Sequence, residues 1–196
     1  MAQTPVNLGS EIKLFGKWSF EELEVKDPSL QRYVSLKPIW LPHSGGRHEH
    51  QKFNKSKVNV VERLVNNMMR PGKRGGKKTR TINIIRLTFE LIHLKTDRNP
   101  IEVLVGAIEN SAPTEDTTRV GRGGIVYNRA VDISPQRRVD LALRFLSDST
   151  RNRPHSNLKT VEESLADELI AASEGDNRSY AVSKKNEMER VALASR

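Results

Sequence analysis

The sequence predicts a mainly α-helical protein: a six-helix bundle with a projecting β-hairpin ribbon and an extended N-terminal arm. Three observations lead to this fold class. From residue 57 onward, apolar residues recur at the spacing of amphipathic helices. One stretch, at about residues 115–133, is instead rich in β-branched and aromatic residues around a glycine-centred turn. Prolines interrupt the first 55 residues, where no periodic pattern develops.

The composition favours a partner that carries negative charge. The chain of 196 residues has 33 Lys and Arg residues against 24 Asp and Glu residues, a formal net charge of +9. Basic proteins bind polyanions because each neutralised phosphate releases condensed counterions. Hydrophobic residues make up 36% and aromatic residues 5%, which is low for a protein that buries a large core unaided. We therefore expect a partner to cover part of its surface.

Several classes of protein are excluded by what the chain lacks. It contains no cysteine, which excludes disulfides, thiolate zinc sites and cysteine nucleophiles. No apolar run approaches the roughly 20 residues that span a bilayer, and the N-terminus has no signal-peptide pattern. We expect a soluble intracellular protein without a membrane partner.

Residues 1–55 are predicted to form an extension that docks on neighbouring molecules, and residues 56–196 to form the helical domain. The extension ends in a polar stretch and has few apolar residues to fold around. These scattered anchors are Leu14, Phe15, Trp18, Phe20, Leu23, Trp40 and Leu41.

The first two helices are predicted from their apolar residues. The first helix should end where Pro71 and Gly72 interrupt it. Its apolar stripe consists of Val58, Val61, Leu64, Val65 and Met68. The second helix is apolar around most of its surface, so we expect it at the centre of the bundle. Its apolar residues are Ile82, Ile84, Ile85, Leu87, Phe89, Leu91, Ile92 and Leu94.

The other four helices are marked by start signals. Asn99 followed by Pro100 is typical of a helix N-terminus, and Ser134-Pro135 repeats this pattern. Thr160 and Glu163 have the spacing of a capping box for the fifth helix, which Gly175 closes. The last helix should run from about residue 179 toward residue 193.

The ribbon lies between the third and fourth helices. Two runs, residues 115–120 and 125–133, flank four residues that include three glycines, and glycine permits the positive φ angles of a hairpin turn. The second run does not alternate cleanly between polar and apolar residues. We therefore expect a partner to contact this ribbon on more than one face.

The densest positive charge follows the first helix. Glycines lie among these cations and would let the backbone approach phosphates, while Lys and Arg supply charged donors. The alternative is a solvated flexible linker. The candidate RNA-binding residues here are Arg70, Lys73, Arg74, Lys77, Lys78 and Arg80.

The ribbon and the fourth helix add further cations. On the ribbon, Arg119, Arg122 and Arg129 accompany Tyr127, a combination that suits phosphate contact and base stacking. An ordinary surface hairpin is the alternative. Arginines at the start of the fourth helix oppose the helix dipole, which a nearby phosphate would offset; otherwise they form a solvated face. The fourth helix carries Arg137, Arg138 and Arg144, followed by Arg151 and Arg153.

A cluster of imidazoles raises the question of a metal site. Residues His43, His48, Glu49 and His50 could ligate zinc in a suitable frame. They lie in a loop bordered by glycine and proline, so we interpret them as solvent-exposed or RNA-adjacent side chains and expect no metal. No nucleophile elbow, P-loop, dinucleotide fingerprint or zinc-protease motif occurs. We expect neither a cofactor nor an enzymatic activity.

One stretch of the chain is much more specific than its charge. It reads NPIEVLVGAIENSAPTEDTTRVGRGGIVYNRAVDISPQRRVDLALRFL, residues 99–146. Through this stretch the sequence resembles the universal ribosomal small-subunit protein seven family, called protein five in the eukaryotic convention. The resemblance covers about residues 53–193, and the segment LADELIAASEGDNRSYAVSKKNEMER matches the family's acidic helix and basic last helix. The most specific positions are the Asn99-Pro100 start, Ala107, Glu109, Asn110, Gly123, Gly124, Tyr127, Arg137 and Arg138.

The resemblance implies a structural role in the small ribosomal subunit. It implies binding to the 3′ major domain of small-subunit ribosomal RNA, nucleation of the head, and a ribbon beside messenger RNA and exit-site (E-site) transfer RNA. Neighbouring proteins of the head and platform would be partners, without homo-oligomerisation. Carried over by position, the ribbon residues would be Arg119, Arg122, Gly123, Gly124, Tyr127 and Arg129. The rRNA-binding residues would be those of the linker and fourth helix with Lys184 and Lys185.

The two ends of the chain depart from the bacterial pattern of the family, and these departures indicate the source. About 55 residues precede the first helix, as in eukaryotic and archaeal members, and the bacterial aromatic tail is missing. We expect a cytosolic eukaryotic ribosome, with assembly in the nucleolus.

Two rival functions are a free-standing RNA chaperone or assembly factor and a small metal-dependent hydrolase that uses His43 to His50. Neither explains the match at residues 99–146.

Overall fold

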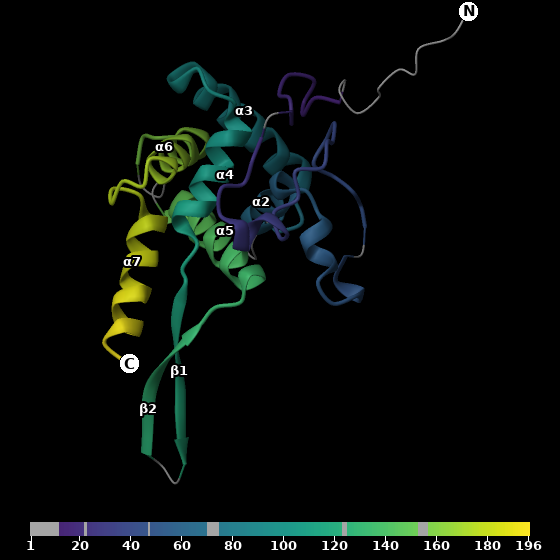
Figure 1. Cartoon of the computed structure of the whole chain (residues 1–196). Helices are drawn as coiled ribbons and strands as arrows, with labels where there is room; N and C mark the ends of the chain where they lie inside the picture. The colour runs from purple at the N-terminus through teal and green to yellow at the C-terminus, as the bar shows by residue number, and fades with distance from the viewer. Residues whose placement is uncertain (1–11, 22, 47, 70–74, 123–124, 153–156) are drawn as a thin grey trace, which may run out of the picture.

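A computed structural model describes residues 12–21, 23–46, 48–69, 75–122, 125–152 and 157–196. In chain order its elements are α1 (Pro28–Gln31), the short 3-10 helices η1 (His48–His50) and η2 (Asn54–Lys57), α2 (Val60–Met68), α3 (Lys78–Thr96), α4 (Pro100–Ser111), β1 (Glu115–Arg122), β2 (Ile125–Asp132), α5 (Pro135–Asn152), α6 (Val161–Ser173) and α7 (Tyr180–Leu193). Helices α2 to α7 form a bundle from which the two strands project (Figure 1). The prediction of a mainly α-helical fold with a β-hairpin ribbon is confirmed.

Helices α4 to α7 begin where the sequence signals place them. The Asn99 side chain accepts a hydrogen bond from the backbone N–H of Ile101 at the start of α4. Thr160 and Glu163 form the predicted capping box of α6. Gly175 follows α6 with a φ of +72°, a conformation that glycine adopts without strain. Local hydrogen bonds at these ends therefore agree with the pattern of the sequence.

Helix α4 lies at the centre of the bundle. It packs against α6 and also contacts α3, α5 and α7. Both sides of α4 are buried, which its apolar composition permits. Its buried residues are Pro100, Ile101, Val103, Leu104, Val105, Ala107, Ile108 and Ser111.

The expectation that the second helix would be the central one is wrong. Ile85, Phe89 and Ile92 of α3 are fully buried, but Leu94 on the opposite side is 77% exposed. Leu87, seven residues earlier, is exposed on the same side. Apolar composition alone did not distinguish a helix that is buried all round from one with leucines on an open face.

The N-terminal arm belongs to the core, in contrast to the expected separate extension. Leu14 and Leu30 are fully buried in the same hydrophobic cluster as the helices. The arm crosses α3, where Lys17 pairs with Glu90, and continues past α4 to α5. The arm contains only short helices such as α1, but its apolar side chains still pack into the core of the bundle. Docking of the arm on neighbouring molecules stays a prediction.

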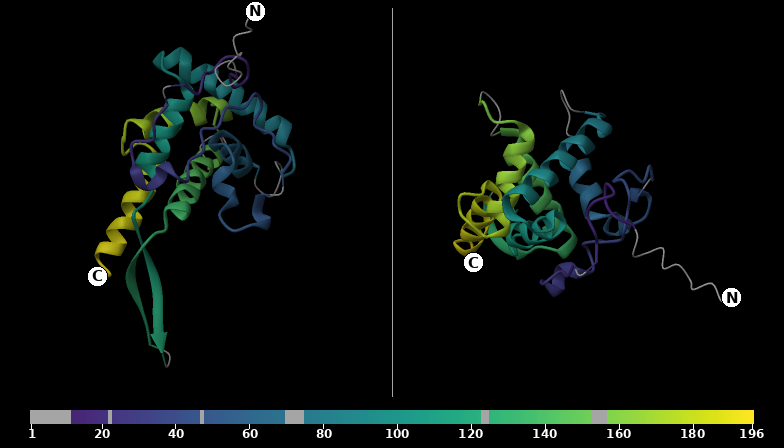
Figure 2. Two further views of the ribbon diagram at one scale, coloured as in Figure 1. Left: turned by 45° about the vertical axis from the view of Figure 1, so that its right-hand side comes forward. Right: turned by 90° about the horizontal axis from the view of Figure 1, so that it is seen from above.

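The ribbon extends away from the helices in two different views (Figure 1, Figure 2). Strands β1 and β2 pair in antiparallel register from Glu115 with Asp132 to Arg122 with Ile125. Their bounds agree with the predicted stretch of residues 115–133. Of the helices in the described residues, none is long and apolar enough to cross a membrane.

Candidate nucleic-acid interface

The register of the ribbon assigns each side chain to one of two faces. Val120 lies opposite Tyr127, and Thr118 lies opposite Arg129. Because cross-strand partners share a face and successive residues alternate, Tyr127 and Arg129 lie on one face. Arg119, which lies opposite Asn128, is on the other face. The ribbon therefore presents a cation on each side, with an aromatic residue on one side.

Both faces of the ribbon are open to solvent. Tyr127 is 57% exposed and Val126, on the opposite face, is 63% exposed. The uneven pattern of the second strand does not reflect a bulge, since the pairing is continuous over the whole ladder. It reflects apolar side chains on both faces. Gly123 and Gly124 lie outside the described residues, and Arg122 is placed by its backbone alone at the end of β1.

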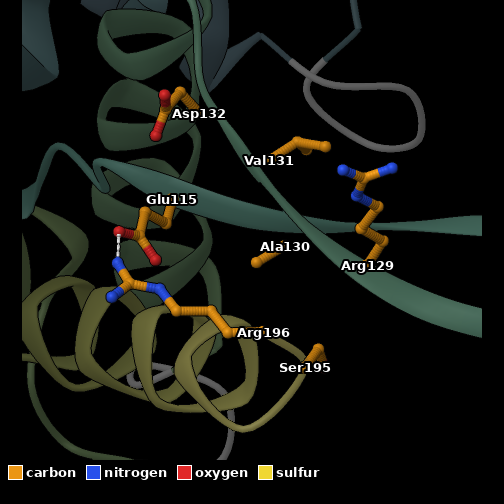
Figure 3. A pocket seen from close by; sticks show the side chains of 7 residues that line it. All are labelled: Glu115, Arg129, Ala130, Val131, Asp132, Ser195 and Arg196. Carbon is orange, nitrogen blue, oxygen red and sulfur yellow. Dashed lines mark hydrogen bonds and ion pairs between the residues drawn. The ribbon is translucent and has the colours of Figure 1, made fainter.

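The end of α7 holds the base of the ribbon on one side (Figure 3). Glu115 and Asp132 lie directly opposite each other in the ladder, an arrangement that repels. The Arg196 guanidinium forms an ion pair with Glu115 and offsets this repulsion. The backbone N–H of Ala130 donates to the Ser195 carbonyl at 3.4 Å. In Figure 3 the Arg129 side chain points away from this ion pair, so Arg129 does not take part in it.

The hollow between the ribbon and α7 is electrically balanced. It has a volume of about 370 Å³ and is lined by two acidic and two basic side chains. The acids are Glu115 and Asp132, and the bases are Arg129 and Arg196. Such a balance does not favour an anion, and we do not include this hollow in the candidate interface.

Arg138 holds the ribbon base on the other side and has an internal role that the sequence did not indicate. Its side chain is only 12% exposed and lies 3.0 Å from the Asp27 carboxylate. It also donates to the Ser29 hydroxyl and, at 3.1 Å, to the Pro113 carbonyl. Burial opposes ionisation of Asp27, but hydrogen bonds from Ser29 and the Arg138 charge outweigh it and lower the pKa of Asp27. No short-range signal links these residues, because Arg138 and Asp27 are 111 positions apart.

The start of α3 contains the described part of the basic linker. Lys77 and Arg80 are exposed there, and no acidic residue lies in the first turn. Lys78 is different, because its ammonium group lies 2.7 Å from the Glu62 carboxylate of α2. An acid from another helix therefore balances the charge of Lys78. Arg70, Lys73 and Arg74 lie outside the described residues.

Glu62 is nearly buried, and its charge is compensated from two directions. Burial raises its pKa, but hydrogen bonds from Lys78 and from the backbone and hydroxyl of Ser44 outweigh that effect and lower the pKa of Glu62. The Ser44 hydroxyl also lies 2.8 Å from the Nε2 atom of His48. The group around Glu62 therefore ties the arm to α2 and α3.

The remaining predicted cations lie mostly on the surface. Arg144 and Arg151 of α5 are exposed, and Arg137 is exposed at 3.5 Å from Asp116. Lys184 of α7 pairs with Glu187 at 2.5 Å, and Lys185 is half-buried. Arg153 lies outside the described residues. In the described parts of the chain, no group of three His, Asp or Glu side chains is placed to hold a metal ion.

Comparison with known proteins relates this arrangement to one family. Residues 30–196 match the family model described as "Ribosomal protein S7p/S5e". The chain is also 50% identical, over 187 residues, to the "Small ribosomal subunit protein uS7" of Methanococcus aeolicus. That alignment covers 95% of this chain and 100% of the relative, so it includes most of the N-terminal arm.

Proposed function

Since this chain belongs to the ribosomal protein S7p/S5e family, we propose a specific place for it within the small ribosomal subunit. Family membership makes it a structural, non-enzymatic component of that subunit with ribosomal RNA and ribosomal proteins as partners. In our proposal it binds the 3′ major domain of the rRNA and stabilises the head. Its ribbon lines the exit site beside messenger RNA and transfer RNA.

The observation that carries the proposal is the exposed ribbon. An isolated two-stranded hairpin is at best marginally stable in water, yet this one extends beyond the bundle with both faces open. Tyr127 with Arg129 on one face and Arg119 on the other suit stacking and phosphate contacts. Single-stranded RNA offers both kinds of contact.

The exposed and half-buried cations of the bundle are proposed to bind the rRNA itself. Arg138 and Lys78 are left out because their charged groups are engaged inside the protein. Phosphate contacts from the others would position the protein without reading sequence. The proposed set is Lys77, Arg80, Arg137, Arg144, Arg151, Lys184 and Lys185, with Arg70, Lys73, Arg74 and Arg153 from the undescribed segments.

We further propose a cytosolic ribosome as the location. The features of the sequence favour a eukaryotic source with nucleolar assembly, but the long arm does not separate eukaryotic from archaeal members. The relative from Methanococcus aeolicus aligns along its whole length with 95% of this chain. Nucleolar assembly is therefore proposed only for a eukaryotic source.

Shortening the ribbon tests the proposal. Deleting the tip between Thr117 and Asn128 removes exposed residues and little of the core. We expect the variant to fold and enter subunits, and those subunits to retain exit-site tRNA less well or to select start sites less accurately. Normal tRNA retention and start-site selection in subunits that contain the variant would contradict the proposed role. Failure to fold or to assemble would identify the ribbon as a structural strut instead.

A further inference from the structure

Phe53 combines a backbone conformation that is unusual for a bulky residue with an exposed aromatic ring. Three non-glycine residues of the described chain have a positive φ: Phe15, Phe53 and Asp97. Asp97 ends α3, and Phe15 lies in a tight turn before Gly16 and packs against the core. Phe53, with a φ of 62°, directly precedes η2 as its N-cap, but unlike the ring of Phe15 its ring is 64% exposed. Strain of this kind in a bulky residue persists mainly where it serves a function.

Hydrogen bonds within the loop fix the backbone around Phe53. The Ser56 hydroxyl donates to the Phe53 carbonyl at 2.6 Å, and the Ser56 backbone N–H donates to the same oxygen at 3.1 Å. The N–H of Asn54 donates to the Gln51 carbonyl at 3.2 Å. Helices η1 and η2 on either side of Phe53 pack against each other. The aromatic ring is thus presented to solvent by a loop that is already ordered.

The surroundings of Phe53 are basic. The segment 48–57 contains three lysines and one glutamate, and Lys52 and Lys57 are exposed. The third, Lys55, shares the Asp140 carboxylate with Arg63, at 3.1 Å and 2.7 Å. One carboxylate between two cations leaves an excess of positive charge.

A cavity of about 330 Å³ lies beside the same segment. Lys55 and Arg63 line it together with the side chains of His48, Asn66 and Asn67, and none of the described residues that line it is acidic. The volume is in the range of pockets that hold small organic ligands. Amide side chains supply both donors and acceptors for the edge of a nucleobase.

We propose that the segment 48–57 binds a single-stranded stretch of RNA, with one base stacked on Phe53. Lys52 and Lys57 bind its phosphates, and a neighbouring nucleotide occupies the cavity at Lys55 and Asn66. An exposed aromatic residue among lysines suits RNA better than an apolar protein surface, because stacking and phosphate contacts use both groups. The inference rests on the proposed rRNA-binding function and adds a site that the ribbon and the α3 cations do not include.

Substitution of Phe53 by glycine separates this role from a structural one. Glycine adopts a positive φ without strain, so Phe53→Gly should not lower the melting temperature of the full-length protein. Its affinity for a transcript of the 3′ major domain should fall roughly 5- to 150-fold, the loss of one stacked base. The slope of log Kd against log salt should not change, because no phosphate contact is lost. Phe53→Tyr, which keeps the ring, should bind like the parent protein.

The outcomes distinguish this inference from the proposed function. If Phe53→Gly binds the transcript as tightly as the parent does, the inference is wrong. It is also wrong if the only defect of subunits with this variant is the loss of a neighbouring protein, because Phe53 would then contact that protein and not RNA. A Lys77→Ala, Arg80→Ala double variant that binds more weakly would then leave the proposed function intact. If the parent does not prefer this transcript to unrelated RNA of equal length, the proposed function itself fails.

Discussion

At the scale of single residues, cations of this protein divide between internal and external roles. Arg138 and Arg137 are neighbours in sequence, but their side chains are 12% and 63% exposed. Arg138 bonds to a carboxylate, a hydroxyl and a carbonyl, whereas Arg137 lies 3.5 Å from one carboxylate. Exposure and hydrogen-bond saturation therefore separate a structural arginine from one that is available to RNA.

Replacing these two arginines in turn tests the division. Arg138→Ala leaves the Asp27 carboxylate and the Pro113 carbonyl without this donor, and should lower the free energy of unfolding by about 1.5–3 kcal/mol. Arg137→Ala should change it by no more than about 0.5 kcal/mol. Urea denaturation measures both values. Equal effects of the two substitutions would refute the assignment of Arg138 to the interior.

Glu62 should make the stability of the protein depend on pH in acid. The pKa of Glu62 is lower in the folded protein than the ordinary value of 4.5, which applies to the unfolded chain. A lowered pKa contributes stability above the unfolded value, and this contribution is lost as the pH falls through the folded value. The melting temperature should therefore decline below about pH 4.5. Glu62→Gln should melt lower at neutral pH and show a flatter decline, whereas an unchanged decline would exclude Glu62 as its source.

At the scale of elements, the ribbon is a separate unit held at its base. Thr114 donates its backbone N–H and its hydroxyl to Glu189 of α7, both at 2.9 Å. The Arg196–Glu115 ion pair lies on the same side, and Arg138 contacts Pro113 on the other. The contacts are concentrated where the strands leave the bundle, so the base sets the direction of the ribbon and the tip stays accessible.

Loss of the Arg196 side chain should loosen this base without unfolding the protein. The pair with Glu115 is partly exposed, so Arg196→Ala should cost less than about 1 kcal/mol of global stability. Amide hydrogens of residues 114–116 and 130–133 should exchange faster, because Glu115 and Asp132 then repel each other. Adding Glu115→Gln should restore slow exchange. Unchanged exchange in Arg196→Ala would show that the ion pair does not hold the ribbon.

Local signals in the sequence predicted the elements well, and long-range packing is where prediction failed. The caps at Asn99 and Thr160 use residues within one turn, which a linear pattern contains. The open face at Leu94 and the burial of Leu14 depend on which segments pack together. The same holds for the candidate interface, because Glu62 neutralises Lys78 from another helix. Exposed cations and bonded cations look alike in sequence.

At the scale of the whole molecule, the arm and the bundle form one body that carries the ribbon. Leu14 and Leu30 of the arm are buried with residues of α3 and α4. The core therefore extends across the predicted boundary at residue 55, and the ribbon is the element that leaves it (Figure 2). This arrangement separates the surface that would anchor to rRNA from the strands that would reach messenger and transfer RNA.

The central claim is that the ribbon lies beside RNA at the exit site, and a tethered cleavage reagent tests it most directly. The chain has no cysteine, so Asn128→Cys, at an exposed ribbon position, provides a single attachment point for Fe(II)-EDTA. Leu158→Cys, which is exposed after the far end of α5, is the matched control. In reconstituted ribosomes the probe at residue 128 should cleave messenger RNA and exit-site tRNA, and the probe at residue 158 should cleave neither. Cleavage of rRNA alone from residue 128 would contradict the account.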